Sequence, residues 1–273
     1  MTRKNTCLRS VCKALAIAHL LALPLLAQAH RSFLVPSSTV LSPTAHQWVS
    51  VDAARGNDLF FFNHNALPLE GLQIISPAGA AVNPAKLERF QYKAVFEWQL
   101  TAPGTWRAAV VNDGLRVQWQ DNGQSKRWNG PAADFAQSVP ANAENLSVNE
   151  VASRVDTFVT MGKPSPLALS GKGLEVRYDT HPNDLVKGEP ATLTFLQDGQ
   201  PAPKLKVSIF PGAARYRDGT QQMNLVTDEQ GRLQIHWPSA GMYWISAATK
   251  VAATFPQAKQ KTLGYAATLE VLP

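Results

Sequence analysis

The chain has 273 residues, 45% of them hydrophobic and 17% charged, which is enough to form the cores of two domains of ordinary size. Its formal charge of +6 would fall to +2 on removal of residues 1–29, which carry four basic and no acidic side chains. Net charge therefore gives no support for a role in binding nucleic acid or a membrane surface.

The first 29 residues have the three parts of a secretory signal. Its basic region consists of Arg3, Lys4, Arg9 and Lys13. An apolar run over residues 14–26 follows, interrupted by His19 and Pro24, and Ala27-Gln28-Ala29 then forms a small-x-small cleavage signal. Because the run is too short to span a bilayer as a stable helix, we expect a periplasmic protein that begins at His30 and is not embedded in the membrane. The alternative is an uncleaved N-terminal anchor.

Short strands and turns follow up to residue 162. We expect strands at Gln47–Asp52, Leu72–Ile75, Ala94–Leu100, Thr105–Val111, Leu115–Gln120 and Ser125–Trp128. Ala102-Pro103-Gly104 predicts a hairpin between the third and fourth strands, and Asp121-Asn122-Gly123 predicts one between the last two. A short helix is expected within Pro131–Gln137, followed by a surface connection over Ser138–Asn149.

The second hairpin carries two tryptophans that test its register. A tight Asn122-Gly123 turn makes Trp119 and Trp128 diagonal neighbours on one face, whereas a four-residue loop places them directly opposite each other. Either register lets the two rings touch.

A segment rich in proline and glycine, Met161–Pro166, predicts a linker between two domains, because these residues interrupt helices and strands. Seven short strands are expected beyond it, at Leu174–Thr180, Ala191–Leu196, Leu205–Phe210, Met223–Thr227, Arg232–Trp237, Met242–Ala248 and Tyr265–Leu272. Their spacing is typical of an immunoglobulin-like or transthyretin-like sandwich. We therefore expect an all-β protein with a β-rich domain at residues 30–162 and a β-sandwich at 163–273.

His30 is the most specific candidate for chemistry. After cleavage it would carry a free α-amine, and this amine and the imidazole Nδ1 can close a six-membered chelate ring on a metal ion. The amine has an ordinary pKa near 8 and so gives up its proton to a metal readily, while imidazole suits copper, nickel, cobalt and zinc. The alternative is that histidine follows the cleavage site without any role in binding.

A second ligand would come from another histidine. In order of preference the candidates are His64, His236, His181 and His46. His64 ends the aromatic run Phe60-Phe61-Phe62-Asn63, and alternation places His236 on the face of its strand opposite Leu233, Ile235 and Trp237. None of these residues forms a compact ligand signature, and each has an ordinary structural interpretation as a loop or surface histidine.

The segment Gly212–Asp218 is a further candidate. Its Arg215, Tyr216 and Asp218 could surround an anionic ligand or support the metal ligands, although an ordinary structured loop is the favoured interpretation. Nucleophile elbows, phosphate-binding glycine loops and dinucleotide fingerprints are missing from the sequence, which disfavours an enzyme.

Several segments together carry a resemblance to a known family. They are Ala29–Pro36, Asn57–His64, His181–Val186, Arg215–Asp218, Thr227–Gly231 and Trp237–Trp244. In them the chain resembles a periplasmic family of a domain of unknown function, often described as the periplasmic component of a nickel/cobalt transport system. The resemblance implies secretion, a β-rich N-terminal part, an immunoglobulin-like C-terminal part and a link to transition metals, and the family pattern includes His30 and His64.

Three functions remain open on this basis. The first is a protein that binds nickel or cobalt, with copper or zinc as alternatives, and hands the ion to a membrane metal transporter. The second is a metal-independent module that docks on a transporter. The third is an oxidative copper enzyme with a histidine brace, for which an N-terminal histidine and a second histidine would supply the ligands.

Overall fold

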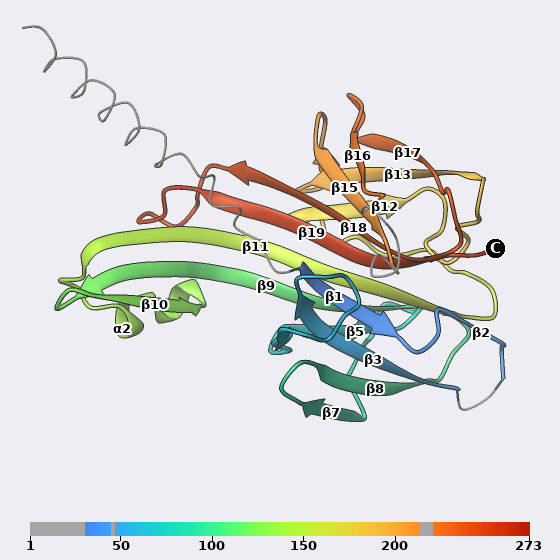
Figure 1. The fold of residues 1–273 in the computed structure, drawn as a ribbon, viewed down its shortest axis with the longest axis horizontal. Coiled ribbons are helices and arrows are strands. Elements are labelled where there is room, and N and C mark those ends of the chain that lie inside the picture. The colour runs from blue at the N-terminus through green and yellow to red at the C-terminus, as the bar shows by residue number, and fades with distance from the viewer. Residues whose placement is uncertain (1–30, 45–46, 213–220) are drawn as a thin grey trace, which may run out of the picture.

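The computed structural model describes residues 31–44, 47–212 and 221–273, so the signal segment lies outside the described part of the chain. The expected all-β class is confirmed, because these residues form 19 strands and only two short helical turns, η1 (Ala132–Asp134) and α2 (Phe135–Ser138). The strands build three sheets (Figure 1). No helix in the described ranges has the length and apolarity needed to cross a membrane.

A five-stranded sheet lies in the N-terminal half, with the order β1-β3-β8-β7 and with β4 also paired to β3. Its strands are β1 (Arg31–Pro36), β3 (Gln47–Gly56), β4 (Asn65–Ala66), β7 (Lys86–Arg89) and β8 (Ala94–Leu100). Burial alternates along β8, where Ala94, Phe96, Trp98 and Leu100 face the core. This face packs against the second sheet.

The second sheet has ten strands and runs through both halves of the molecule, in the order β16-β15-β18-β19-β11-β9-β5-β6. Its N-terminal members are β2 (Val40–Leu41), β5 (Leu72–Ile75), β6 (Ala81–Val82), β9 (Gly104–Asp121), β10 (Gln124–Gly130) and β11 (Glu144–Met161). Its C-terminal members are β15 (Lys206–Pro211), β16 (Met223–Val226), β18 (Gly241–Val251) and β19 (Lys261–Val271). β11 pairs with β9 on one edge and in parallel with β19 on the other, so the β11–β19 pairing joins the halves (Figure 1).

The third sheet completes a sandwich in the C-terminal half. It contains β12 (Leu174–Tyr178), β13 (Pro190–Gln197), β14 (Gln200–Pro201) and β17 (Arg232–His236). Its inner face packs against β15, β18 and β19 around a core that includes Phe195, Trp237 and Tyr243. All seven strands expected beyond residue 173 are present, and the alternation expected in β17 is confirmed, with Leu233 and Ile235 buried and His236 exposed.

Three expectations for the N-terminal half were wrong. Thr105–Val111 and Leu115–Gln120 are not separate strands, because both lie within β9. Ala94–Leu100 and Thr105–Val111 do not form a hairpin, because β8 and β9 belong to different sheets and face each other across the core. Both segments have one apolar face, and packing these faces together buries more apolar surface than pairing their edges would. The polar stretch Ser138–Asn149 is not only a surface connection, since β11 begins at Glu144.

The Asn-Gly hairpin is confirmed with a tight turn. Asn122 and Gly123 have φ values of 49° and 75°, as a primed two-residue turn requires, and Asp121 pairs with Gln124. Trp119 then lies opposite Lys126 and Trp128 opposite Val117, which makes the two tryptophans diagonal neighbours. The short helix expected after this hairpin is also present, as η1 and α2.

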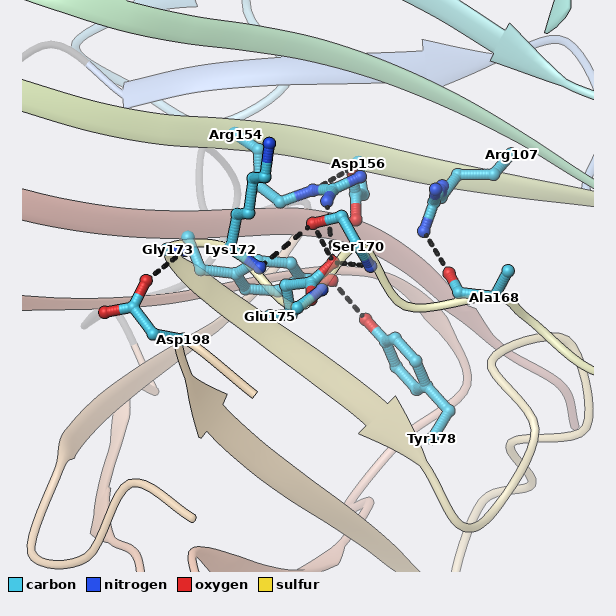
Figure 2. Close-up of polar contacts among 12 residues, drawn as sticks. Arg107, Arg154, Asp156, Ala168, Ser170, Lys172, Gly173, Glu175, Tyr178 and Asp198 are labelled. Carbon is cyan, nitrogen blue, oxygen red and sulfur yellow. Dashed lines mark hydrogen bonds and ion pairs between the residues drawn. The ribbon is translucent and has the colours of Figure 1, made fainter. Parts of the chain in front are cut away.

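A buried ionic cluster lies where β11 meets the third sheet (Figure 2). Arg154 Nε donates to Asp156 at 3.0 Å and Nη1 donates to Glu175 at 3.1 Å, and all three residues are at most 8% exposed. Glu175 also accepts hydrogen bonds from Ser170 and from the Gly171 backbone N–H. The cluster fixes the loop before β12 against β11.

Glu150 forms a second buried anchor on β11. Its carboxylate accepts hydrogen bonds from the hydroxyl and backbone N–H of Thr254 and from the Phe255 N–H, and it pairs with Lys261 at 3.0 Å. Burial opposes ionisation of the carboxyl group, but these hydrogen bonds outweigh it and lower the pKa of Glu150 to about 2.

This carboxylate should make folding stability dependent on acid pH. Since the folded-state pKa lies below the unfolded value, the stabilisation is complete above about pH 5 and is lost as the pH falls toward 2. We expect the free energy of unfolding of the wild type to fall by about 2–3 kcal/mol more over this range than that of Glu150→Gln. Urea unfolding at several pH values measures the difference, and parallel pH profiles for the two proteins would contradict this role.

Candidate functional site

Two of the candidate histidines adjoin segments that meet at one end of β3. Arg31, the residue after His30, pairs with Gly56, and Asn65, the residue after His64, pairs with Arg55 from the opposite edge of β3. With a strand spacing of about 4.8 Å, the Cα atoms of Arg31 and Asn65 lie roughly 10 Å apart. We call this end of β3, together with the residues packed around it, the junction site.

Aromatic side chains hold the loop between β3 and β4 against β1. Phe33 is fully buried, and its ring lies 5.6 Å from the ring of Phe60 and 6.0 Å from that of Phe62. Phe60 adopts a φ of 63°, an uncommon conformation for a bulky residue that the surrounding packing must maintain. Gly56 permits the turn, because a Cβ there would lie 2.7 Å from the carbonyl oxygen of Asp58.

The C-terminal half supplies the other wall of the junction site. The Arg31 guanidinium lies 4.2 Å from the centre of the Phe210 ring, and Trp244 Nε1 donates to the Ser32 carbonyl at 2.9 Å. Gly212 N donates to the Met242 carbonyl at 2.6 Å, and a Cβ at Gly212 would lie 3.1 Å from the Phe60 ring. The start of β1, the aromatic loop and the end of β15 are therefore held together.

A mainly apolar cavity of about 350 Å³ opens at this contact. Its lining comes from both halves and includes Leu59, Phe60, Phe61, Gly212, Met242 and Tyr243. Arg31 lies beside the aromatic wall, where its Nη1 donates to the Asn57 carbonyl at 3.2 Å. Partial burial lowers the pKa of Arg31, and the nearby carboxylate of Asp58 opposes that shift.

The structure places the sequence-predicted histidines differently. His64 is half-buried and belongs to the junction site, directly before β4. His181 lies beside the start of β9, where its Nε2 lies 3.0 Å from Thr105 Oγ1. Its Nδ1 accepts a hydrogen bond from the Asn183 backbone N–H at 3.2 Å. These two contacts give His181 a structural role. His236 is exposed at the end of β17, opposite Pro190.

The remaining candidates, His30, His46, Arg215, Tyr216 and Asp218, lie outside the described residues. Within the described ranges, no group of three or more histidine, cysteine, aspartate or glutamate side chains could hold a metal ion. A metal centre at the junction site therefore requires ligands from outside those ranges in addition to His64.

The sequence made His64 a candidate ligand but did not reveal the contact between the halves that surrounds it. The aromatic run before His64 was one signal, because three consecutive phenylalanines in a loop need apolar partners. Phe210 and Trp244 supply those partners, together with Phe33 and Leu59, in a small core of their own.

Comparisons with known proteins give a family without an assigned function. No curated protein matches the chain. Solved structures that are similar include the D0-D1 domain of intimin, at 12% identity and a TM-score of 0.23, which covers 88% of this chain and 97% of that one. A DUF4785 family protein from Legionella pneumophila is 10% identical with a TM-score of 0.24, covering 83% of this chain and 52% of the other. The Yersinia pseudotuberculosis adhesin InvE is 11% identical with a TM-score of 0.23, and the match covers 86% of this chain and 58% of the adhesin chain.

A family model described as Domain of unknown function (DUF4198) matches residues 27–251, and the chain therefore belongs to this family.

Proposed function

We propose that the mature protein is a periplasmic carrier of a transition-metal ion, nickel or cobalt in the first place and copper or zinc as alternatives. The observation that carries the proposal is the pairing at the end of β3, where the residues that follow His30 and His64 flank Arg55 and Gly56. Because strand pairing holds Arg31 and Asn65 at the same end of β3, it supports a site shared by the two histidines that precede them, which are 34 positions apart in sequence.

The available donors suit this class of ion. His30 would provide an amine and an imidazole nitrogen and His64 a second imidazole, and nitrogen ligands of this kind favour nickel, cobalt, copper and zinc over magnesium or calcium. The aromatic packing around Phe33 and Phe60 fixes the β3–β4 loop, so the His64 backbone would be positioned before an ion arrives.

Three protein nitrogens would leave other coordination positions for water or for a group on a partner. Such a site would release its ion more readily than a closed four-ligand site, which suits transfer of the ion to a membrane transporter. The protein itself would carry out no chemical step, so the ion is cargo in this proposal.

Calorimetric titration of the protein beginning at His30 with nickel, cobalt, copper and zinc tests the proposal. We expect one ion per chain, and we expect His30→Ala and His64→Ala each to weaken binding at least ~10-fold, which corresponds to ~1.4 kcal/mol. His236→Ala is the matched control, because it removes an exposed histidine of the C-terminal sandwich and should leave the affinity unchanged. Equal affinities for the wild type and both site variants would refute the proposed ligand set.

A further inference from the structure

A second site is indicated by three arginines at the rim of the N-terminal half. Val49, Val51 and Ala53, which alternate along β3, face the core, and Arg55 is the next and last residue of this row. Because side chains alternate along a strand, Arg55 projects toward the ten-stranded sheet, as these three residues do. It does so just beyond the last buried residue of that row.

Arg89 and Arg116 lie on two other strands near the same core. Arg89 on β7 pairs with the buried Ala94 of β8, and Arg116 on β9 continues the row of Trp106, Ala108 and Val110. Ala94 and the rows of β3 and β9 belong to one hydrophobic core, whereas the four residues of β7 are exposed. Three guanidinium groups therefore project past the edge of this core from two facing sheets.

Like charges surround Arg55 in this cluster. Arg55 is half-buried, whereas Arg89 and Arg116 are exposed. In the described part of the chain none of the three forms an ion pair, although several other arginines do. Burial of Arg55 and the like charges of Arg116 and Arg89 lower its pKa, and only Glu70 among the neighbouring groups opposes this. Two cations and one carboxylate are thus named among the charged neighbours of Arg55.

We propose that Arg55, Arg89 and Arg116 bind a small oxyanion that carries phosphate or carboxylate groups. Guanidinium groups bind such groups through pairs of parallel hydrogen bonds, which suits them to this role. The site shares no side chain with the proposed metal ligands, although Arg55 pairs with Asn65, the residue after His64. Of the three arginines, only Arg55 belongs to the junction site.

Titration calorimetry with inorganic phosphate and with succinate, each against sodium chloride of equal ionic strength, tests the site. The chloride control is needed because salt alone screens repulsion among the arginines. We expect saturable binding of at least one of the two anions, and we expect Arg55→Gln and Arg116→Gln each to weaken it at least ~10-fold. Arg177→Gln removes an equal charge from an exposed ion pair with Asp179 and should leave binding unchanged.

Thermal unfolding provides a second measurement that does not require a well-behaved Arg55 variant. Phosphate or succinate should raise the melting temperature of the wild type and of Arg177→Gln above the chloride value, but not that of Arg116→Gln, whose side chain is exposed. Cosedimentation with phosphatidylglycerol vesicles distinguishes a lipid headgroup, which would carry the protein into the pellet, from a free anion. Absence of saturable binding, or equal affinity in the wild type and Arg116→Gln, would overturn the inference.

Discussion

Replacement of Arg154 by methionine is expected to lower the free energy of unfolding by about 3–5 kcal/mol, because it leaves buried carboxylates without their cation. Asp156 and Glu175 are 3% and 2% exposed, and Arg154 pairs with both. Glu175 would keep its bonds from Ser170 and Gly171, so Asp156 should account for most of the loss. Removal of one partner from a buried ion pair is far more costly than removal of the whole pair.

Urea unfolding of Arg154→Met measures this effect, with Arg177→Met as the matched control. Arg177 pairs with Asp179 at the same 3.0 Å, but 55% of its side chain is exposed, so we expect a change of less than about 1 kcal/mol. The double variant Arg154→Met with Asp156→Asn should recover part of the lost stability. A loss below 1 kcal/mol for Arg154→Met alone would show that the buried cluster does not hold β12 against β11.

Replacement of Phe33 by alanine is expected to cost about 3–5 kcal/mol, because it opens a cavity in the small core between the two halves. Phe33 is fully buried and contacts both Phe60 and Phe62. Loss of its ring should also release the β3–β4 loop, including Phe60 with its strained φ of 63°. The variant should therefore weaken metal binding even though Phe33 is not a ligand.

Chemical unfolding and metal titration of the same Phe33→Ala sample separate these two effects. Phe90→Ala is the control, because Phe90 is 57% exposed and its truncation should change stability by no more than about 0.5 kcal/mol. If Phe33→Ala loses stability but binds metal as the wild type does, the aromatic core does not position His64.

Local patterns predicted the C-terminal half of the fold well. Apolar residues alternate there in short runs between clear turn signals, as in Arg232–His236, and such strands depend little on distant context. The Asn122-Gly123 turn was equally predictable, because its residue types suit positive φ.

The central strand β11 was not predictable by the same means. Its polar residues Glu150, Arg154 and Asp156 are buried, and only partners far along the chain make this burial acceptable. The hairpin expected between β8 and β9 failed for a related reason, since choosing between edge pairing and face packing requires knowledge of the other strands.

The candidate site was only partly accessible from sequence. His30 and His64 could be ranked by their own chemistry, but the sequence did not show that β1 and β4, which begin directly after them, pair with opposite edges of β3. His181 is a similar case, because its hydrogen bonds to Thr105 and Asn183 become apparent only once β9 and the loop after β12 lie together.

The central claim is that the α-amine of His30 and the His64 imidazole hold a metal ion at the end of β3. The most direct measurement compares nickel binding by protein beginning at His30 with that by protein retaining Ala29, which keeps every side chain after Ala29 but moves the amine one residue away. We expect the added residue to weaken binding at least ~10-fold. Equal affinities of the two proteins would contradict the chelate and, with it, the proposed metal site.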